Sequence, residues 1–262
     1  MRSKAGAGKR GLLWLLLAAL LTPQPLQAAE IRVAVASNFR HVMAELATRF
    51  EAAKGHEVTV IPGSSGKHYA QIRNGAAFDV FLAADVERPR RLEEEGLGVP
   101  GSRFDYAIGQ LVLWAPGAGR LDDPRAWLAS NDPARLAIAN PRLAPYGKAA
   151  REVLEAWGLW RPLQARLVRG ENIAQAFQFV ATGNAPAGLV ALSQVLVFDD
   201  AMPGTYRVIP GRLHAPIRQQ GLLLRRIGRS LETTANFADE LVLQRGKTIA
   251  QHSRITALRQ LR

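Results

Sequence analysis

The chain of 262 residues carries 34 Lys and Arg against 22 Asp and Glu, a formal net charge of +12, and contains no cysteine. The basic residues are scattered singly, with neither a nucleic-acid-binding motif nor a basic stripe interleaved with aromatics, so we expect no nucleic-acid partner. Without cysteine the chain has no disulfides, no thiolate metal ligands and no thiol for a lipid anchor. A basic balance is also typical of proteins that bind an anionic membrane surface or attract small anions, and the scattered distribution favours small anions.

The first 28 residues are predicted to form a signal peptide. Basic residues within the first ten precede an apolar run over 11–21, and a small-residue cleavage site follows at Ala28. The run is far shorter than the roughly 20 apolar residues of a membrane-spanning helix, so we expect cleavage after Ala28 rather than a retained anchor. The mature protein is therefore expected in the periplasm, free of a lipid anchor.

From Glu30 onward, short apolar strands alternate with helical segments, a pattern typical of α/β folds with parallel strand pairing. The elements predicted for the first block are strands at 31–37, 57–64 and 79–85, a helix at 38–55, and a second helix that ends at Asn74–Gly75. In the 38–55 helix, Leu46 and Phe50 mark a single apolar face, which predicts that this helix packs on the sheet.

A second and a third block continue the alternation. The elements predicted for the second block are strands at 107–116, 134–141, 165–170 and 186–193, with helices at 147–159 and 172–183. A strand at 216–226 and an amphipathic helix at 230–244 are predicted for the third. No linker rich in Gly, Ser or Pro separates the blocks, so we expect a continuous molecule of two lobes.

Two lobes joined in this way predict a cleft, with the ligand beyond the carboxyl ends of the strands. We expect the chain to cross between the lobes near 106–109 and again near 209–216. The predicted division is a signal peptide at 1–28, lobe 1 at 29–106 and 211–262, and lobe 2 at 107–210.

Four segments place the end of a strand directly before the start of a helix. They are Ala36–Phe39, Gly63–Gly66, Pro145–Lys148 and Gly170–Ile173. A helix start offers unpaired N–H groups and about half a positive charge, so several of them aimed at one point would hold a dianion without any Arg. Each turn taken alone is also an ordinary helix cap, and only their convergence in space makes a site.

Other chemistry finds less support. Ser64 and Ser65 with Lys67 match the S-x-x-K pattern of penicillin-recognising enzymes, but the companion motifs do not follow, which leaves a secreted serine hydrolase as the rival function from another class. The histidines show no metal-ligand spacing, so we expect neither a catalytic centre nor a site for a free metal cation. His41 and His68 are expected on solvated helix faces.

Three segments carry a family resemblance: Ala-Ser-Asn-Phe at 36–39, Gly-Ser-Ser-Gly-Lys at 63–67 and Ala-Pro-Tyr-Gly-Lys-Ala-Ala at 144–150. Together with the rest of the mature chain they resemble the periplasmic molybdate-binding proteins of ABC transporters. The resemblance implies a two-lobed α/β periplasmic binding protein fold of type II, with a mixed, mostly parallel sheet flanked by helices in each lobe. It also implies a monomer without a cofactor or catalysis, whose ligand is molybdate or tungstate and whose partners are a permease and its ATPase.

Carried over residue by residue, the resemblance puts ligand contacts on Ser37 and Ser65 in lobe 1. In lobe 2 it puts them on Tyr146 and on Ile173, which acts through its backbone N–H. Asn38 is expected to add a further backbone donor.

One position departs from the pattern. Where some family members have a tyrosine, this chain has Ala191, which has no side-chain donor. Tyr146 is therefore favoured as the phenolic donor, although the direction of its hydroxyl is not readable from sequence.

The expected donors are neutral, and this predicts selectivity. Molybdate, tungstate and sulfate are unprotonated dianions near neutral pH and only accept hydrogen bonds. Hydrogen phosphate carries an O–H group that needs an acceptor, and leaving it unpaired costs roughly 1 to 3 kcal/mol. A carboxylate from Glu171 would weaken this discrimination if it reached the ligand, and sulfate remains an alternative because only cavity size separates it from molybdate.

Overall fold

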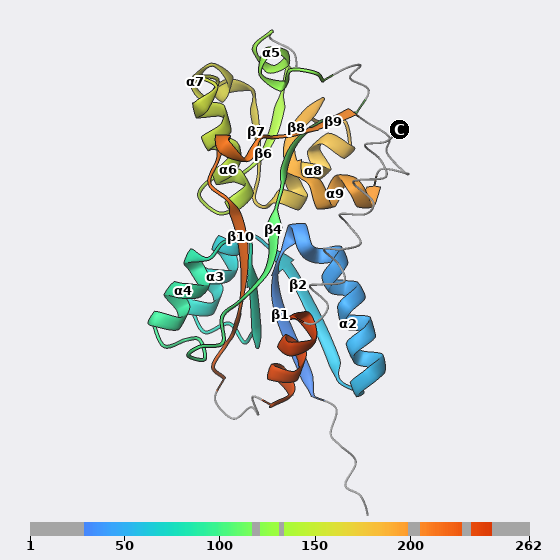
Figure 1. The fold of residues 1–262 in the computed structure, drawn as a ribbon, viewed down its shortest axis with the longest axis vertical. Helices are drawn as coiled ribbons and strands as arrows, with labels where there is room; N and C mark the ends of the chain where they lie inside the picture. Colours follow the sequence, from blue (N-terminus) through green and yellow to red (C-terminus); the bar gives the residue numbers. More distant parts are fainter. Residues whose placement is uncertain (1–28, 117–120, 131–133, 199–204, 227–231, 243–262) are drawn as a thin grey trace, which may run out of the picture.

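The computed structural model describes residues 29–116, 121–130, 134–198, 205–226 and 232–242. They form two α/β lobes stacked along the long axis, each built on its own five-stranded sheet, and β4 and β10 run from one lobe towards the other (Figure 1). The predicted two-lobed fold is confirmed. The predicted signal peptide and the last part of lobe 1, beyond residue 242, lie outside the described residues.

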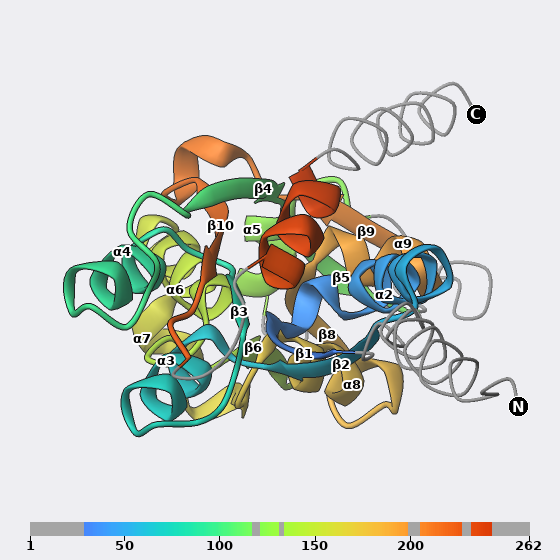
Figure 2. The same ribbon diagram turned by 90° about the horizontal axis from the view of Figure 1, so that it is seen from below.

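Lobe 1 contains a sheet with the strand order β2-β1-β3-β10-β4. Its strands are β1 (Glu30–Ala36), β2 (Glu57–Gly63), β3 (Val80–Ala83), β4 (Phe104–Gly109) and β10 (Ile217–Leu223), and its helices are α2 (Arg40–Lys54), α3 (Ser65–Arg73) and α4 (Glu87–Glu94). Residues 232–242 form a further helix. Helices α3 and α4 cover one face of the sheet, while α2 and the 232–242 helix cover the other (Figure 2).

Lobe 2 contains a sheet with the order β7-β6-β8-β5-β9. Its strands are β5 (Leu111–Ala115), β6 (Leu136–Ala139), β7 (Leu167–Gly170), β8 (Ala187–Ala191) and β9 (Thr205–Val208), and its helices are α5 (Pro124–Ala129), α6 (Pro145–Ala156), α7 (Trp160–Leu163), α8 (Ile173–Ala181) and α9 (Leu192–Phe198). Short 3-10 turns complete the two lobes: η1 (Ser37–Phe39), η2 (Gln164–Arg166) and η3 (Gly211–Leu213).

Both sheets are mixed, as predicted. β1 pairs in parallel with β2 and β3, and β6 pairs in parallel with β7 and β8. The antiparallel pairings involve β10 in lobe 1 and β5 in lobe 2. Parallel and antiparallel pairings are therefore equally frequent in each sheet.

The amphipathic pattern of the first helix is borne out. Met43, Leu46 and Phe50 of α2 are buried and belong to the same core as the buried valines of β1. Gly55 then adopts a φ of 69°, a left-handed conformation that glycine reaches without steric cost and that ends the helix. Burial of this one face fixes α2 on the sheet, so its N-terminal end and the preceding η1 lie at the carboxyl end of β1.

The strand predicted over 107–116 is wrong as a single element. Its first part belongs to β4, which pairs with β10 as far as Gly109, and its second part is β5, which pairs with β8 from Leu111. The chain therefore passes from one sheet to the other at Gln110. The apolar pattern runs through this point without interruption, so it does not reveal the change of sheet, and the predicted lobe boundary between 106 and 107 falls within β4.

Gly109 allows the chain to pass close to lobe 2 at this crossing. A Cβ atom there would overlap the hydroxyl oxygen of Tyr146 on α6. The strand that joins the lobes therefore passes directly against a side chain of lobe 2, at the edge of the cleft.

The helix starts of both lobes lie at the interface between them. η1 follows β1, α3 follows β2, α6 follows β6 and α8 follows β7. The carboxyl ends of parallel strands share one edge of a sheet, and in Figure 1 these two edges face one another. The two sheets thus bring the four predicted turns together.

Candidate functional site

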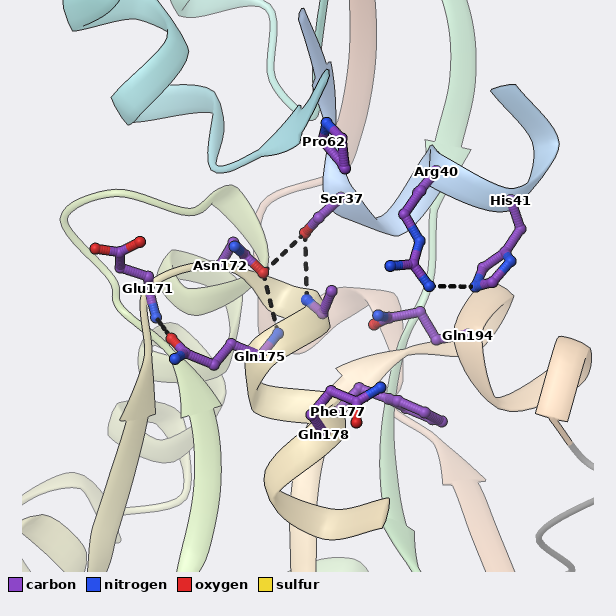
Figure 3. Close-up of a pocket in the computed structure, with 11 residues that line it drawn as sticks. Ser37, Arg40, His41, Pro62, Glu171, Asn172, Gln175, Phe177, Gln178 and Gln194 are labelled. Atoms are coloured by element: carbon purple, nitrogen blue, oxygen red, sulfur yellow. Dashed lines mark hydrogen bonds between the residues drawn. The ribbon is translucent and has the colours of Figure 1, made fainter. Parts of the chain in front are cut away.

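Ser37 connects the two lobes. It lies in η1, directly after β1, and is buried. Its hydroxyl donates to Oδ1 of Asn172 at 3.1 Å and accepts from the N–H of Ala174 at 3.2 Å, both at the start of α8 (Figure 3). The Ser37 turn of lobe 1 and the α8 turn of lobe 2 are therefore in direct contact.

The two serines of the Gly-Ser-Ser-Gly turn have different roles. Ser64 is the N-cap of α3, and its hydroxyl accepts from the N–H of Lys67 at 3.3 Å. Ser65 is only 1% exposed, and its hydroxyl oxygen accepts from the N–H of Ala84 at 2.9 Å. No acceptor for the Ser65 proton occurs among the described residues, so Ser65 is a buried donor that is free for a ligand.

The start of α3 also touches lobe 2. The N–H of Gly66 donates to the backbone oxygen of Leu143, just before α6, at 2.8 Å. A Cβ atom at Gly66 would come within 2.8 Å of that oxygen and 3.0 Å of the Leu143 Cα. This approach therefore requires glycine, because any larger residue would push the two lobes apart.

Tyr146 lies in the first turn of α6, after Pro145, and is buried. Its hydroxyl is hydrogen-bonded to the Gln219 side chain, and burial raises the pKa of the phenol, so the group stays neutral. The backbone N–H groups of Tyr146 and Gly147 have no partner within the described ranges. The phenol that the sequence favours as a ligand donor is thus engaged by the protein, whereas the backbone donors are free.

Ile173 is the first residue of α8, and Asn172 caps this helix by accepting from the N–H of Gln175 at 3.0 Å. The following N–H groups have partners, since Ala174 donates to Ser37 and Ala176 donates to the backbone oxygen of Asn172. In the part of the chain that the structure describes, the Ile173 N–H is left without an acceptor. Its side chain is buried in the lobe 2 core, so only the backbone can reach a ligand.

Asn38 is 5% exposed and makes two hydrogen bonds. Its Nδ2 contacts Oε1 of Gln219 at 2.9 Å, and its backbone oxygen accepts from the hydroxyl of Ser193 at 3.1 Å. The other atom of the amide, Oδ1, is buried without a partner. The structure therefore brings the predicted turns of Ser37, Asn38, Ser65, Tyr146 and Ile173 together at the interface between the lobes.

Gln219 was not predicted from sequence. It lies on β10, is only 2% exposed, and contacts Asn38, Tyr106 and Tyr146. The available signal was the pair Gln219–Gln220, two adjacent polar residues in the strand predicted at 216–226, just after a predicted crossing. A buried amide at such a position needs hydrogen-bond partners from both sides.

Charged side chains at the rim of the interface pair with one another. Lys67 and Glu171 form an ion pair between the lobes, and each is about half exposed. Arg88 pairs with Asp85 and also donates to the backbone oxygen of Arg142 at 3.4 Å. The Glu171 carboxylate, whose position decides the selectivity expected from sequence, is therefore bound to a lysine and points away from Ser37 (Figure 3).

A pocket of about 310 Å³ lies beside the Ser37–Asn172 contact (Figure 3). Most of the residues that line it have polar side chains, among them Arg40, His41, Gln175, Gln178 and Gln194. The lining comes mainly from η1 and α2 on one side and from α8 and α9 on the other. Burial, and then the Arg40 charge, lower the pKa of His41. The pocket gives the interface an opening to solvent next to the turns that precede α2 and α8.

Two alternatives, a metal centre and a serine hydrolase site, find no support among the described residues. The described residues contain no cluster of three or more side chains able to hold a metal ion. Ser64 and Ser65 both accept from backbone N–H groups, and the Lys67 amine is paired with Glu171 rather than with a serine. A serine nucleophile needs an adjacent base, so this arrangement does not favour the hydrolase alternative.

The expectation that His68 lies on a solvated helix face is wrong. His68 is buried, and its ring packs edge-on against Phe78 with the ring centroids 5.7 Å apart. Burial lowers its pKa. Gly63 leaves the space that the imidazole fills, because a Cβ atom at that position would come within 2.6 Å of it.

The fold and the cleft define a two-lobed solute-binding protein. The model of the bacterial extracellular solute-binding protein family matches residues 31–253, and the chain belongs to this family. No helix in the described ranges is long and apolar enough to cross a membrane.

The relatives are molybdate-binding proteins. The chain is 51% identical over 198 residues to the molybdate-binding protein ModA of Azotobacter vinelandii, which covers 76% of this chain and 79% of the relative. It is 46% identical over 201 residues to ModA of Rhodobacter capsulatus, covering 77% and 78%. The solved structure of the periplasmic molybdate-binding protein of Azotobacter vinelandii aligns with a TM-score of 0.75 and 38% identity, covering 80% of this chain and 92% of the other.

Proposed function

We propose that this protein captures molybdate, and tungstate with it, in the cleft between its lobes, and delivers the anion to a membrane permease driven by an ATPase. The observation that carries the proposal is the convergence of neutral donors from four helix starts, seen in the contacts of Ser37 with Asn172 and of Gly66 with Leu143. The molybdate-binding relatives support it, because two of them share about half of their aligned residues with this chain.

Each lobe supplies a part of the site. In lobe 1 the donors are the hydroxyls of Ser37 and Ser65 together with Asn38, and in lobe 2 they are the backbone N–H groups of Tyr146 and Ile173. A helix start stabilises a nearby anion through its free N–H groups and its dipole. No charged side chain needs to touch the ligand, since these donors and dipoles compensate two negative charges.

Lobe closure couples capture to delivery. An anion bound to one lobe alone has donors on one side only, whereas the closed form surrounds it with donors from both. The ligand therefore stabilises the closed form by its difference in affinity for the two forms. In the bound state the Ser37 proton turns from Asn172 to the ligand, while Ser37 continues to accept from Ala174. The permease then recognises the closed form.

The same donor set accounts for selectivity. A fully deprotonated oxyanion accepts hydrogen bonds at every oxygen, which matches a site made of donors. The O–H group of hydrogen phosphate would be buried without an acceptor, because Glu171 is bound to Lys67. Phosphate should therefore bind at least about 5-fold more weakly than molybdate.

The proposed protein is exported, works as a monomer and does not catalyse a reaction. The leader at 1–28 would direct the chain to the periplasm, where it works free of a lipid anchor, a cofactor or a nucleic-acid partner. Molybdenum would be bound as molybdate through its oxygens rather than as a metal cation. The protein would release its ligand unchanged.

Titration calorimetry of the mature protein with molybdate, tungstate, sulfate and phosphate tests the proposal. A fluorescence signal is also expected, because Trp114 stacks on Phe177 of α8 with the ring centroids 4.6 Å apart. We expect molybdate and tungstate to bind most tightly and phosphate weakly. Equal or tighter binding of phosphate would contradict the donor site, and preferential binding of sulfate would make this a sulfate-binding protein.

A further inference from the structure

A buried hydrogen-bond network surrounds Gln219 on β10, the strand that joins the lobes. One end of its amide contacts Nδ2 of Asn38 at 2.9 Å and the hydroxyl of Tyr106 at 3.1 Å, and its other end is bonded to the hydroxyl of Tyr146. Asn38 belongs to lobe 1 and Tyr146 to lobe 2. Gln219 therefore connects two of the predicted ligand-binding turns.

The Tyr106 hydroxyl limits how this network can be protonated. It lies 3.0 Å from the backbone oxygen of Ala83 and 3.1 Å from the near atom of the Gln219 amide. A phenol has a single proton, and a backbone oxygen can only accept. The proton of Tyr106 therefore goes to Ala83, and the Gln219 atom beside it must be a donor.

The nitrogen and oxygen of a side-chain amide have nearly the same shape, so their hydrogen-bond partners decide which is which. The contacts given above place the Gln219 oxygen beside Tyr106 and beside Nδ2 of Asn38, so this requirement exchanges nitrogen and oxygen in both amides. With the Gln219 nitrogen beside Tyr106, its two protons go to the Tyr106 oxygen and to Asn38. The Asn38 atom that faces Gln219 is then its oxygen. The Gln219 oxygen lies on the opposite side and accepts from the neutral hydroxyl of Tyr146.

In this arrangement every group that contacts Gln219 has a hydrogen-bond partner, and one donor of the network, on Asn38, remains without an acceptor. The Asn38 amide atom without a partner in the described protein is now its NH₂ group, which is buried, and Asn38 directly follows the buried Ser37. A buried donor without an acceptor is costly, and an oxyanion between the lobes supplies the acceptor.

We infer that Gln219 is a positioning residue that orients the Asn38 amide so that its NH₂ group, rather than its carbonyl oxygen, faces the ligand. The inference rests on the proposed function, and it names the class of ligand that the site accepts. An oxyanion with unprotonated oxygens finds a donor at Asn38, whereas the reverse orientation would present an acceptor and favour an anion that carries an O–H group.

The side-chain amide signals of ¹⁵N-labelled protein test the orientation, with the Asn38 pair assigned by its loss in Asn38→Asp. On addition of molybdate we expect the NH₂ signals of Asn38 to shift together with the backbone signal of Ile173. A shift at Ile173 with unmoved Asn38 side-chain signals would overturn the inference and leave the proposed function intact. No shift at either position would mean that the protein does not take molybdate here, and the proposed function would fail.

The Gln219→Met variant tests the positioning role, because methionine has a similar length and no amide. Freed from Gln219, Asn38 can rotate, so we expect the ratio of molybdate to phosphate affinity to fall at least about 5-fold. The matched control is Gln220→Met, since Gln220 is also buried on β10 but bonds to Asp105 and Arg103 away from the site. The control should leave the ratio unchanged.

A purely structural Gln219 would give a different result. In that case Gln219→Met would lower the affinity for both anions by the same factor, or lower only the unfolding temperature, and either outcome would overturn the positioning role. Should this variant fail to fold, the wild-type Asn38 signals still decide the orientation on which the role depends.

Discussion

The two lobes contribute to the proposed site in different ways. Lobe 1 offers side chains, namely the buried hydroxyls of Ser37 and Ser65 and the amide of Asn38. Lobe 2 offers backbone N–H groups at the starts of α6 and α8, where the side chains of Tyr146 and Ile173 point into the protein. Side-chain identity therefore matters in lobe 1, whereas in lobe 2 the position of a helix start matters.

The largest effect is expected at the point where the lobes touch. In Gly66→Ala the new methyl group would meet the backbone of Leu143, so full closure is blocked. We expect molybdate affinity to fall by about 3 kcal/mol, the upper end of the usual cost of overpacking, with little loss of unfolding free energy. Calorimetry and chemical denaturation measure the two quantities.

Gly188→Ala is the contrasting control for Gly66→Ala. Its methyl group would overlap the Val180 side chain in the core of lobe 2, away from the helix starts, so it should lower the unfolding free energy instead. Equal effects of the two variants on affinity would contradict the assignment of the Gly66 contact to lobe closure.

Ser65→Ala tests a side-chain donor of lobe 1. It removes a hydrogen bond to a charged ligand, so we expect affinity to fall by about 2 kcal/mol. Ser64→Ala is the matched control, because Ser64 only caps α3; it should cost about 1 kcal/mol of stability and leave affinity unchanged. If Ser64→Ala lost as much affinity as Ser65→Ala, the division of roles between the two serines would be wrong.

Ile173→Pro tests a backbone donor of lobe 2. Proline fits the first position of a helix and removes the N–H group while keeping an apolar side chain, and Asn172 before it already has the extended conformation that proline requires. We expect affinity to fall by about 1.5 kcal/mol. Ile173→Val keeps the N–H group and should bind like the wild type. A similar loss of affinity in both variants would mean that the Ile173 N–H group does not bind the ligand.

Tyr146→Phe should have a small effect, below about 1 kcal/mol on affinity, because its hydroxyl bonds to Gln219 rather than to the ligand. Calorimetry over a range of pH provides a second check. Burial raises the pKa of Tyr146 and of Tyr106, so both stay protonated and affinity should not change from neutral to moderately alkaline pH. A large loss in Tyr146→Phe would show that the phenol itself binds the anion.

The smallest expected effect is the contribution of His68, in lobe 1, to the pH dependence of the unfolding free energy. Burial lowers the pKa of His68 below 6.5 in the folded protein, so below about pH 6.5 the unfolded chain takes up a proton that the folded one does not. The stability contributed by neutral His68 is present above that pH and is lost as the pH falls. Denaturation at pH 7.5 and 5.5 should give a smaller difference for His68→Gln than for the wild type, and an equal difference would contradict burial of the neutral ring.

The comparison of the lobes also explains what sequence can predict. The alternation of strands and helices predicted most elements of both lobes, since periodicity and caps are local properties. The break at Gln110 was missed, because two successive strands that join different sheets share one unbroken apolar pattern. The sheet a strand joins depends on distant partners such as β10 and β8.

Within the site, the residues of lobe 1 were easier to predict from the sequence than those of lobe 2. Ser37 and Ser65 are small polar residues at strand ends, which mark a donor site directly. The side chain of Ile173 does not indicate that its backbone N–H group binds a ligand, and this role was predicted only from the family resemblance. Gln219 depends on a contact between residues that are 181 positions apart in the chain, Asn38 and Gln219, and no local pattern predicts it.

The most direct test of the donor site is the crystal structure of the molybdate complex. We predict that the anion contacts the hydroxyls of Ser37 and Ser65, the Asn38 amide and the backbone N–H groups of Tyr146 and Ile173, with no charged side chain within hydrogen-bond distance. A ligand held by Lys67, Arg40 or Arg88, or contacted by the Glu171 carboxylate, would contradict a site of neutral donors divided between side chains in one lobe and backbone in the other.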